Sequence, residues 1–190
     1  MELQIRTLLQ HAWATAVETM GTFLNHALKS SEGPEEWLKF FSLSGSAFAH
    51  LEKTPGVPGY EDLSEKDTLG AVVDEARKLD VRDRLFAYSV AAERVHADRK
   101  SGSYHLIILD LNQKSVTIRT YSQSNLEIAS KDYSEVEESI NKGKLLQAVL
   151  VSAGSVENLR SAYPNYFLDT HEFVRQLNNI EKLVSKNPKK

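Results

Sequence analysis

The first fourteen residues, MELQIRTLLQHAWA, constrain the fold more than any other stretch of this chain. Residues 2–6 alternate between polar and apolar side chains, which is the two-residue period of a strand with one buried face. Glu2, Gln4 and Arg6 would then share one face, while Leu3 and Ile5 would point into a core. An acid, an amide and a guanidinium in a row indicate a surface that binds something.

The pattern changes to helical spacing after this segment. Apolar residues recur every three or four positions from residue 9 to residue 27, which predicts an amphipathic helix over residues 8–28. His11, Thr15, Glu18 and Thr22 would form a polar stripe along another face of this helix. The imidazole of His11 would therefore lie near the strand that precedes it.

This stretch resembles the last strand and following helix of the RelA/SpoT-type nucleotide synthetase domain. The family pattern runs approximately Glu-(Val/Ile)-Gln-(Ile/Leu)-Arg-Thr, followed after a few residues by His-x-x-Ala-Glu. Residues 2–7 read ELQIRT, and residues 11–14 read HAWA. The chain departs from the pattern at Thr15, which stands where the family has an acid.

The resemblance implies an enzyme that transfers pyrophosphate from ATP to the ribose 3′-hydroxyl of GDP or GTP, yielding guanosine tetra- or pentaphosphate. It implies that Glu2 is the catalytic residue and a ligand of Mg²⁺, and that Gln4, Arg6 and His11 bind substrate. The residue types suit this role, because transfer of phosphoryl groups needs metal-held phosphates and an oriented hydroxyl more than covalent help from protein.

The family's ATP-binding basic residues, its first metal-binding aspartate and its guanine-stacking tyrosine all precede this motif. Residue 1 is a methionine directly before the motif. We therefore expect the chain to be the C-terminal part of a synthetase and, in isolation, not to be a working enzyme.

The residue types alone allow a different interpretation of the same segment. Glu2, Gln4 and Arg6 would equally suit the solvent face of an edge strand, and His11 would suit a capping or surface position. Short motifs occur by chance. Only the order of the whole segment, which is the basis of the resemblance, favours the nucleotide site.

Composition narrows the class of protein. With 41% hydrophobic and 26% charged residues the chain has ordinary globular composition. Its formal charge of −3 does not indicate binding to nucleic acid, which requires an excess of positive charge on the binding surface. It has no cysteine, which excludes disulfides and thiol catalysis and fits a cytoplasmic protein. No apolar run reaches the roughly 18 residues of a membrane-spanning helix, so we expect no membrane association.

Further helices are predicted up to residue 99. A proline at residue 34 followed by two acids indicates a helix start, and the aromatic stripe that follows is typical of a core helix. Residues 54–63 contain two prolines and two glycines and read as a loop. Ser64 is a plausible cap of the next helix, and Asp80 separates that helix from a fourth one.

Residues 100–103 form the expected domain boundary, because strand-like patterns follow them. Residues 104–111 and 115–122 predict a hairpin, and residues 126–140 predict an amphipathic helix. The apolar run 145–151 is typical of a central strand covered on both faces. Two further helices would complete a β-β-α-β-α-α module.

We therefore predict an α/β (α+β) protein. Residues 1–99 would be an N-terminal strand and about four helices that complete a nucleotidyltransferase-like synthetase domain, residues 104–184 a small α/β module, and residues 185–190 a tail. The second hypothesis is a non-catalytic regulatory or interaction protein, in which the hairpin edge of the module docks a partner. Homo-oligomerisation is left open by the sequence.

Overall fold

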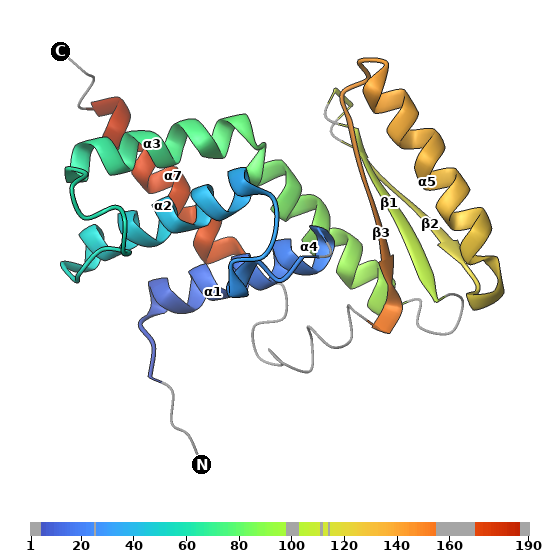
Figure 1. Ribbon diagram of the computed structural model, residues 1–190, viewed down its shortest axis with the longest axis horizontal. Coiled ribbons are helices and arrows are strands. Elements are labelled where there is room, and N and C mark those ends of the chain that lie inside the picture. The colour runs from blue at the N-terminus through green and yellow to red at the C-terminus, as the bar shows by residue number, and fades with distance from the viewer. Residues whose placement is uncertain are drawn as a thin grey trace. The chain divides into compact units, whose positions relative to one another are not determined.

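The fold is seen in a computed structural model, which describes residues 5–24, 26–97, 103–110, 112–113, 115–154 and 170–186, with only the backbone from 91 to 97. The chain mixes helix and strand (Figure 1). The helices are α1 (Leu8–Leu24), α2 (Glu35–Glu52), α3 (Glu65–Lys78), α4 (Val81–Ala97), α5 (Leu126–Asn141) and α7 (His171–Lys186), with short 3-10 turns at Leu28–Ser30 and Gln123–Asn125. The strands are β1 (Tyr104–Asp110), β2 (Ser115–Tyr121) and β3 (Leu146–Ser152).

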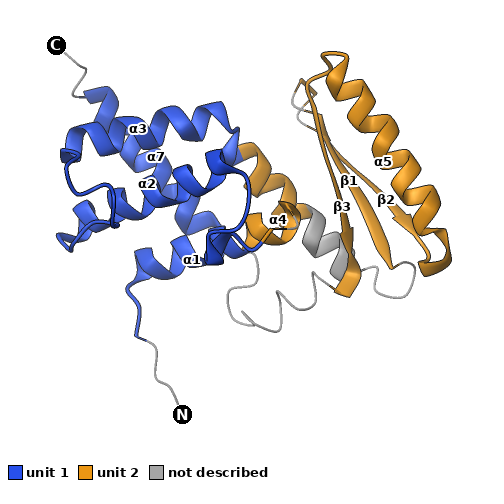
Figure 2. Ribbon diagram, viewed as in Figure 1, with its two compact units in different colours: residues 1–18, 27–82, 169–190 blue, residues 19–26, 83–168 orange. Residues whose placement is uncertain are grey.

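The chain divides into two compact units, shown in different colours in Figure 2. Unit 1 comprises residues 1–18, 27–82 and 169–190, and unit 2 comprises residues 19–26 and 83–168. The helix α7 thus belongs with α2 and α3, whereas the sequence analysis assigned it to the module 104–184. The reason is non-local: the apolar side of α7 packs on helices more than a hundred residues earlier in the chain.

Aromatic packing forms the centre of unit 1. Phe173 of α7 is fully buried, and its ring centroid lies 6.2 Å from Phe40, 6.1 Å from Phe41 and 5.5 Å from Phe48. The three partners all come from α2, and Trp37 extends the same cluster. Edge-to-face contacts at such distances stabilise a core beyond the area they bury. The predicted aromatic stripe of α2 is therefore confirmed as core.

Local signals fix the third helix. The Ser64 side chain accepts a hydrogen bond from the backbone N–H of Asp67 at 3.2 Å, so the predicted cap is confirmed.

A carboxylate of α3, Glu75, is nearly buried and lies 2.5 Å from Nζ of Lys39 in α2. The same carboxylate lies 3.6 Å from Lys78. The contact with Lys39 joins α3 to α2, whereas the contact with Lys78 lies within α3.

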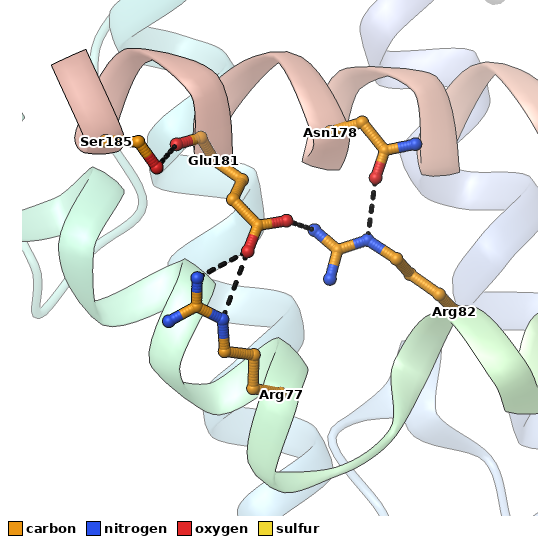
Figure 3. Close-up of polar contacts among 5 residues, drawn as sticks. All are labelled: Arg77, Arg82, Asn178, Glu181 and Ser185. Atoms are coloured by element: carbon orange, nitrogen blue, oxygen red, sulfur yellow. Dashed lines mark hydrogen bonds and ion pairs between the residues drawn. The ribbon is translucent and has the colours of Figure 1, made fainter.

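A charged cluster joins α7 to α3 and to the start of α4 (Figure 3). Glu181 accepts hydrogen bonds from Arg77 and, at 2.8 Å, from Arg82. The Arg82 guanidinium also donates to the side-chain oxygen of Asn178 at 2.8 Å. The bond from Arg77, aided by the charge of Arg82, holds the pKa of Glu181 below its usual value.

Unit 2 contains an antiparallel sheet with the strand order β2-β1-β3. The predicted hairpin is confirmed, because β1 and β2 pair from Tyr104 opposite Tyr121 to Asp110 opposite Ser115. The helix α5 packs against this sheet. Elsewhere in the unit Phe23 and Tyr88 stack with their ring centroids 4.4 Å apart.

The strand β3 corrects one expectation. The apolar run 145–151 was predicted to be a central strand, but within the described sheet β3 pairs with β1 alone. The central strand is β1, whose residues His105, Leu106 and Ile107 are all buried. An uncharged run does not distinguish the centre of a sheet from its edge, because pairing partners are set by the rest of the fold.

The opening of the chain also differs from expectation. Ile5 was predicted to point into a core from a strand, yet it is not in a strand and is 86% exposed. A strand needs neighbours to satisfy its backbone groups, and the described sheet consists of β1, β2 and β3. Residues 1–4, including Glu2, Leu3 and Gln4, lie outside the described residues.

Among the helices that the structure describes, none combines the length and the apolar character needed to cross a bilayer.

The charged cluster generates a prediction about pH. Because the folded-state pKa of Glu181 is depressed, its stabilisation is present above the unfolded-state pKa of about 4.3 and is lost as the pH falls through the folded-state value. We expect Glu181→Gln to lower the free energy of unfolding by about 1 kcal/mol near neutral pH, and the difference from wild type to vanish below the folded-state pKa.

Urea unfolding of both proteins across the acid range measures this difference. Glu138→Gln is the matched control, because Glu138 pairs with Lys142 one turn away and both side chains are about two-thirds exposed, so its loss should change little. A constant difference between wild type and Glu181→Gln from neutral to strongly acid pH would contradict the prediction.

Candidate functional site

Two of the four residues assigned to the site by resemblance can be placed. Glu2 and Gln4 lie outside the described residues, so their proximity to each other or to a ligand is not tested. Arg6 lies on the exposed segment just before α1, and His11 lies in the first turns of α1 and is partly exposed. Arg6 lines a cleft in unit 1, whereas His11 is not among the residues that line it.

A reciprocal pair of hydrogen bonds starts α1 at this cleft. The backbone N–H of Thr7 donates to Oε1 of Gln10 at 3.1 Å, and the backbone N–H of Gln10 donates to Oγ1 of Thr7 at 3.1 Å. This is the capping box, in which the first and fourth residues of a helix start satisfy each other's amides. Thr7 therefore caps α1, which begins at Leu8, and Arg6 directly precedes this cap.

The unit 1 cleft has a volume of about 450 Å³, which is within the range of small-molecule sites. One wall is the start of α1, a second is the C-terminal half of α2, and a third is the loop after α2. Its lining residues are Arg6, Gln10, Trp13, Ala14, Lys29, Gly45, Phe48, Ala49, Glu52, Thr54, Pro55, Gly56, Val57 and Pro58. The lining is mainly apolar, with a few charged side chains.

The indole of Trp13 is the largest flat surface in the unit 1 cleft, and it is held in place from behind. Its Nε1–H donates to the backbone oxygen of Phe41 at 2.8 Å. The two rings meet edge to face with centroids 6.4 Å apart. Because Phe41 also packs on Phe173, the aromatic core of unit 1 fixes the orientation of this wall.

The loop wall is held against α2 at close range. The buried hydroxyl of Ser46 accepts a hydrogen bond from the backbone N–H of Val57 at 3.2 Å. A methyl group at Gly45 would lie 3.1 Å from Cγ2 of Val57 and 3.4 Å from Nε1 of Trp13. Glycine therefore lets loop and indole both approach α2, and Pro55 and Pro58 restrict the backbone of the loop.

Three charged side chains among the described residues line the unit 1 cleft. Arg6 is exposed, and Lys29 forms an ion pair with Glu18 at 2.9 Å. Glu52 ends α2 on the same cleft. Guanidinium and ammonium groups bind phosphate or carboxylate through charge-assisted hydrogen bonds. An aromatic wall beside two cations can accommodate a planar ring that carries an anionic group.

Thr15 stands where the RelA/SpoT-type pattern has an acid, and in this structure it has a structural role. It is 3% exposed, and its hydroxyl donates to the backbone oxygen of His11 at 3.1 Å. A carboxylate here would be buried among apolar neighbours unless it were paired. The side chain of Thr15 packs inside the helix bundle and does not line the cleft.

Mg²⁺ was expected through the resemblance, with Glu2 as a ligand. Within the described ranges no group of three or more histidine, aspartate or glutamate side chains is placed to hold a metal ion. Glu2 lies outside those ranges, so the expectation stays a prediction.

Unit 2 has a cleft of its own, with a volume of about 370 Å³, between α5 and the turn end of the β1–β2 hairpin. The side chains of β2 that line it, Ser115, Thr117 and Arg119, are polar. Asp132 of α5 accepts hydrogen bonds from the Tyr121 hydroxyl at 2.7 Å and from Arg119 at 3.4 Å. These contacts connect helix and sheet, and they engage two of the charged residues that line the cleft, Arg119 and Asp132.

Comparison with known proteins gives no further assignment. No protein-family model matches the chain, and no curated protein matches it.

Lys29, Glu52 and the loop wall were not identified as site residues from the sequence. Gly45, Phe48, Ala49 and Glu52 recur at helical spacing, and they would have indicated one face of α2. Of these four residues only Phe48 was interpreted from the sequence, as a member of the aromatic core stripe, because the aromatic residues of this helix set its apolar face. The prolines and glycines of residues 54–59 correctly indicated a loop but not its packing partner.

The close contact at Gly45 generates a prediction with an internal control. Both Gly45 and Gly70 are helical, and a methyl group at Gly70 would meet nothing within 4 Å. We expect Gly70→Ala to raise the free energy of unfolding by about 0.5–1 kcal/mol through helix propensity. Gly45→Ala should gain less or lose stability, because Val57 and Trp13 must move.

Chemical denaturation measures both stabilities, and tryptophan fluorescence reports on the surroundings of Trp13. A shifted emission spectrum is expected for Gly45→Ala alone. Equal stabilisation by the two substitutions, with unchanged fluorescence, would show that the loop does not pack on α2 as described.

Proposed function

We propose that the chain is the C-terminal part of a RelA/SpoT-like guanosine tetra- or pentaphosphate synthetase with a nucleotidyltransferase-like fold, and that the unit 1 cleft contacts its guanosine nucleotide. One observation carries the proposal: Arg6, a residue of the recognised pattern, lines a cleft that also contains an indole face and a second cation, Lys29.

The chemistry of the cleft suits a nucleotide. A nucleotide combines a flat, weakly polar base with a polyanionic tail. Bases stack on aromatic side chains with about 1–3 kcal/mol per base, and arginine binds phosphate through paired hydrogen bonds. Trp13 offers the stacking surface, and Arg6 and Lys29 offer the positive charge.

The reaction itself comes to the proposal through the resemblance. Pyrophosphate would pass from ATP to the 3′-hydroxyl of GDP or GTP, with Glu2 next to Mg²⁺ and the attacking oxygen. Such transfers depend on positioning and on neutralisation of charge. A rigid helix start carrying Arg6 supports this requirement, because the capping box of Thr7 and Gln10 fixes the backbone beside the guanidinium.

Nucleotide binding by the chain tests the proposal directly. We expect GDP to bind. Arg6→Ala should weaken this binding about 10- to 100-fold, because it removes a hydrogen bond between the guanidinium and a charged phosphate. Isothermal titration calorimetry measures the affinity. Arg119→Ala, in unit 2, is the control and should bind as wild type does. Absence of GDP binding by the wild-type chain would contradict the proposal.

Product formation tests the catalytic part. The chain, and a version extended by its upstream codons, are incubated with Mg²⁺, labelled ATP and GDP, and the products are separated by chromatography. Whichever form makes guanosine tetraphosphate should lose this activity on Glu2→Gln. If that substitution leaves the rate intact, the assignment of Glu2 is wrong.

The second candidate function is a non-catalytic interaction protein that uses unit 2. The observation in its favour is that β2, the second strand of the hairpin, lies at an edge of the described sheet, where a partner strand can be added. A chain that binds no nucleotide but binds a protein partner equally well with and without Arg6 would support this alternative.

A further inference from the structure

Glu52 differs from the other charged residues of the unit 1 cleft in carrying an acceptor rather than donors. It is the last residue of α2, is partly exposed and lines the cleft. A carboxylate in a cleft that also holds Arg6 and Lys29 would oppose binding of a purely anionic ligand. Its presence indicates a ligand with donors at one end and negative charge at another.

The described residues leave the Glu52 carboxylate available to a ligand. No hydrogen bond or ion pair is formed by its side chain with any part of the chain that the structure describes. Two other glutamates of unit 1 form ion pairs: Glu18 pairs with Lys29 at 2.9 Å, and Glu75 pairs with Lys39 at 2.5 Å. Glu52 therefore does not serve to neutralise the cations that line the same cleft.

The spacing along α2 places Glu52 at a useful distance from the stacking surface. Trp13 meets α2 at Gly45, seven residues before Glu52, which is about two helical turns or 10 Å along the axis. Gly45 and Glu52 lie on the same face of α2. A purine stacked on Trp13 and a glutamate side chain extended toward it can together span this distance.

We infer that Glu52 selects guanine over adenine in the unit 1 cleft. The inference rests on the proposed function, because it concerns the same nucleotide. Guanine presents two adjacent donors on its pairing edge, N1–H and the 2-amino group, and the two oxygens of a carboxylate can accept both. Adenine presents an acceptor at N1, which would face the carboxylate without a proton between them. A site built around one hydrogen-bonding pattern strongly rejects the ligand that lacks it.

Calorimetric titration of the full chain with GDP, IDP and ADP tests the inference. Wild type should bind GDP most tightly, IDP less tightly because it lacks the 2-amino group, and ADP weakest. Glu52→Ala should weaken the binding of GDP about 10- to 100-fold. The affinity for ADP should stay the same or rise. Glu36→Ala, an exposed glutamate in the first turn of α2, is the matched control and should retain the wild-type order.

The outcomes separate this inference from the function on which it rests. If wild type binds GDP and Glu52→Ala keeps the same ratio of GDP to ADP affinity, Glu52 is not the selecting residue and the proposed function stands. If wild type binds none of the three nucleotides, the proposed function falls and this inference falls with it. Circular dichroism and thermal unfolding show whether each variant remains folded, and Glu52→Gln, which keeps one acceptor, should lie between wild type and Glu52→Ala.

Discussion

The packing of Phe173 against α2 is the contact on which unit 1 depends. It brings the last helix of the chain onto an aromatic surface formed more than a hundred residues earlier. Phe41 of that surface also contacts Trp13 and accepts the hydrogen bond from its indole. Because interiors are packed at crystal-like density, the position of the indole follows from the core behind it. The cleft wall is thus an extension of the core.

Three local structural features complete the unit 1 cleft around the Trp13 wall. The capping box of Thr7 and Gln10 starts α1 beside Arg6, and Ser46 anchors the proline-containing loop. Gly45 allows the loop and the indole to approach α2 closely. None of these features bears the charges that would meet a ligand. They determine where those charges lie, which is the preorganisation that binding of a polyanion requires.

Features set by neighbours in sequence could be predicted, and features set by distant contacts could not. The helix cap at Ser64 and the β1–β2 hairpin follow from local pattern and are present. Ile5 and Arg6, the described residues of the proposed first strand, lie outside the described sheet because pairing depends on other strands, and β3 was misplaced within the sheet for the same reason. Arg6 was expected to bind substrate because of the resemblance, and it lines the cleft, whereas Glu52 reaches the cleft only through packing.

The central claim is that the unit 1 cleft receives a nucleotide on the face of Trp13, and the indole N–H signals of the protein test it most directly. The chain has two tryptophans: Trp13 lines the cleft, and Trp37 is 2% exposed in the core. In a ¹⁵N-correlated NMR titration with GDP, the account predicts that the Trp13 indole signal shifts in a saturable manner while that of Trp37 stays in place. A Trp13 signal that does not move at GDP concentrations that saturate binding would contradict the account.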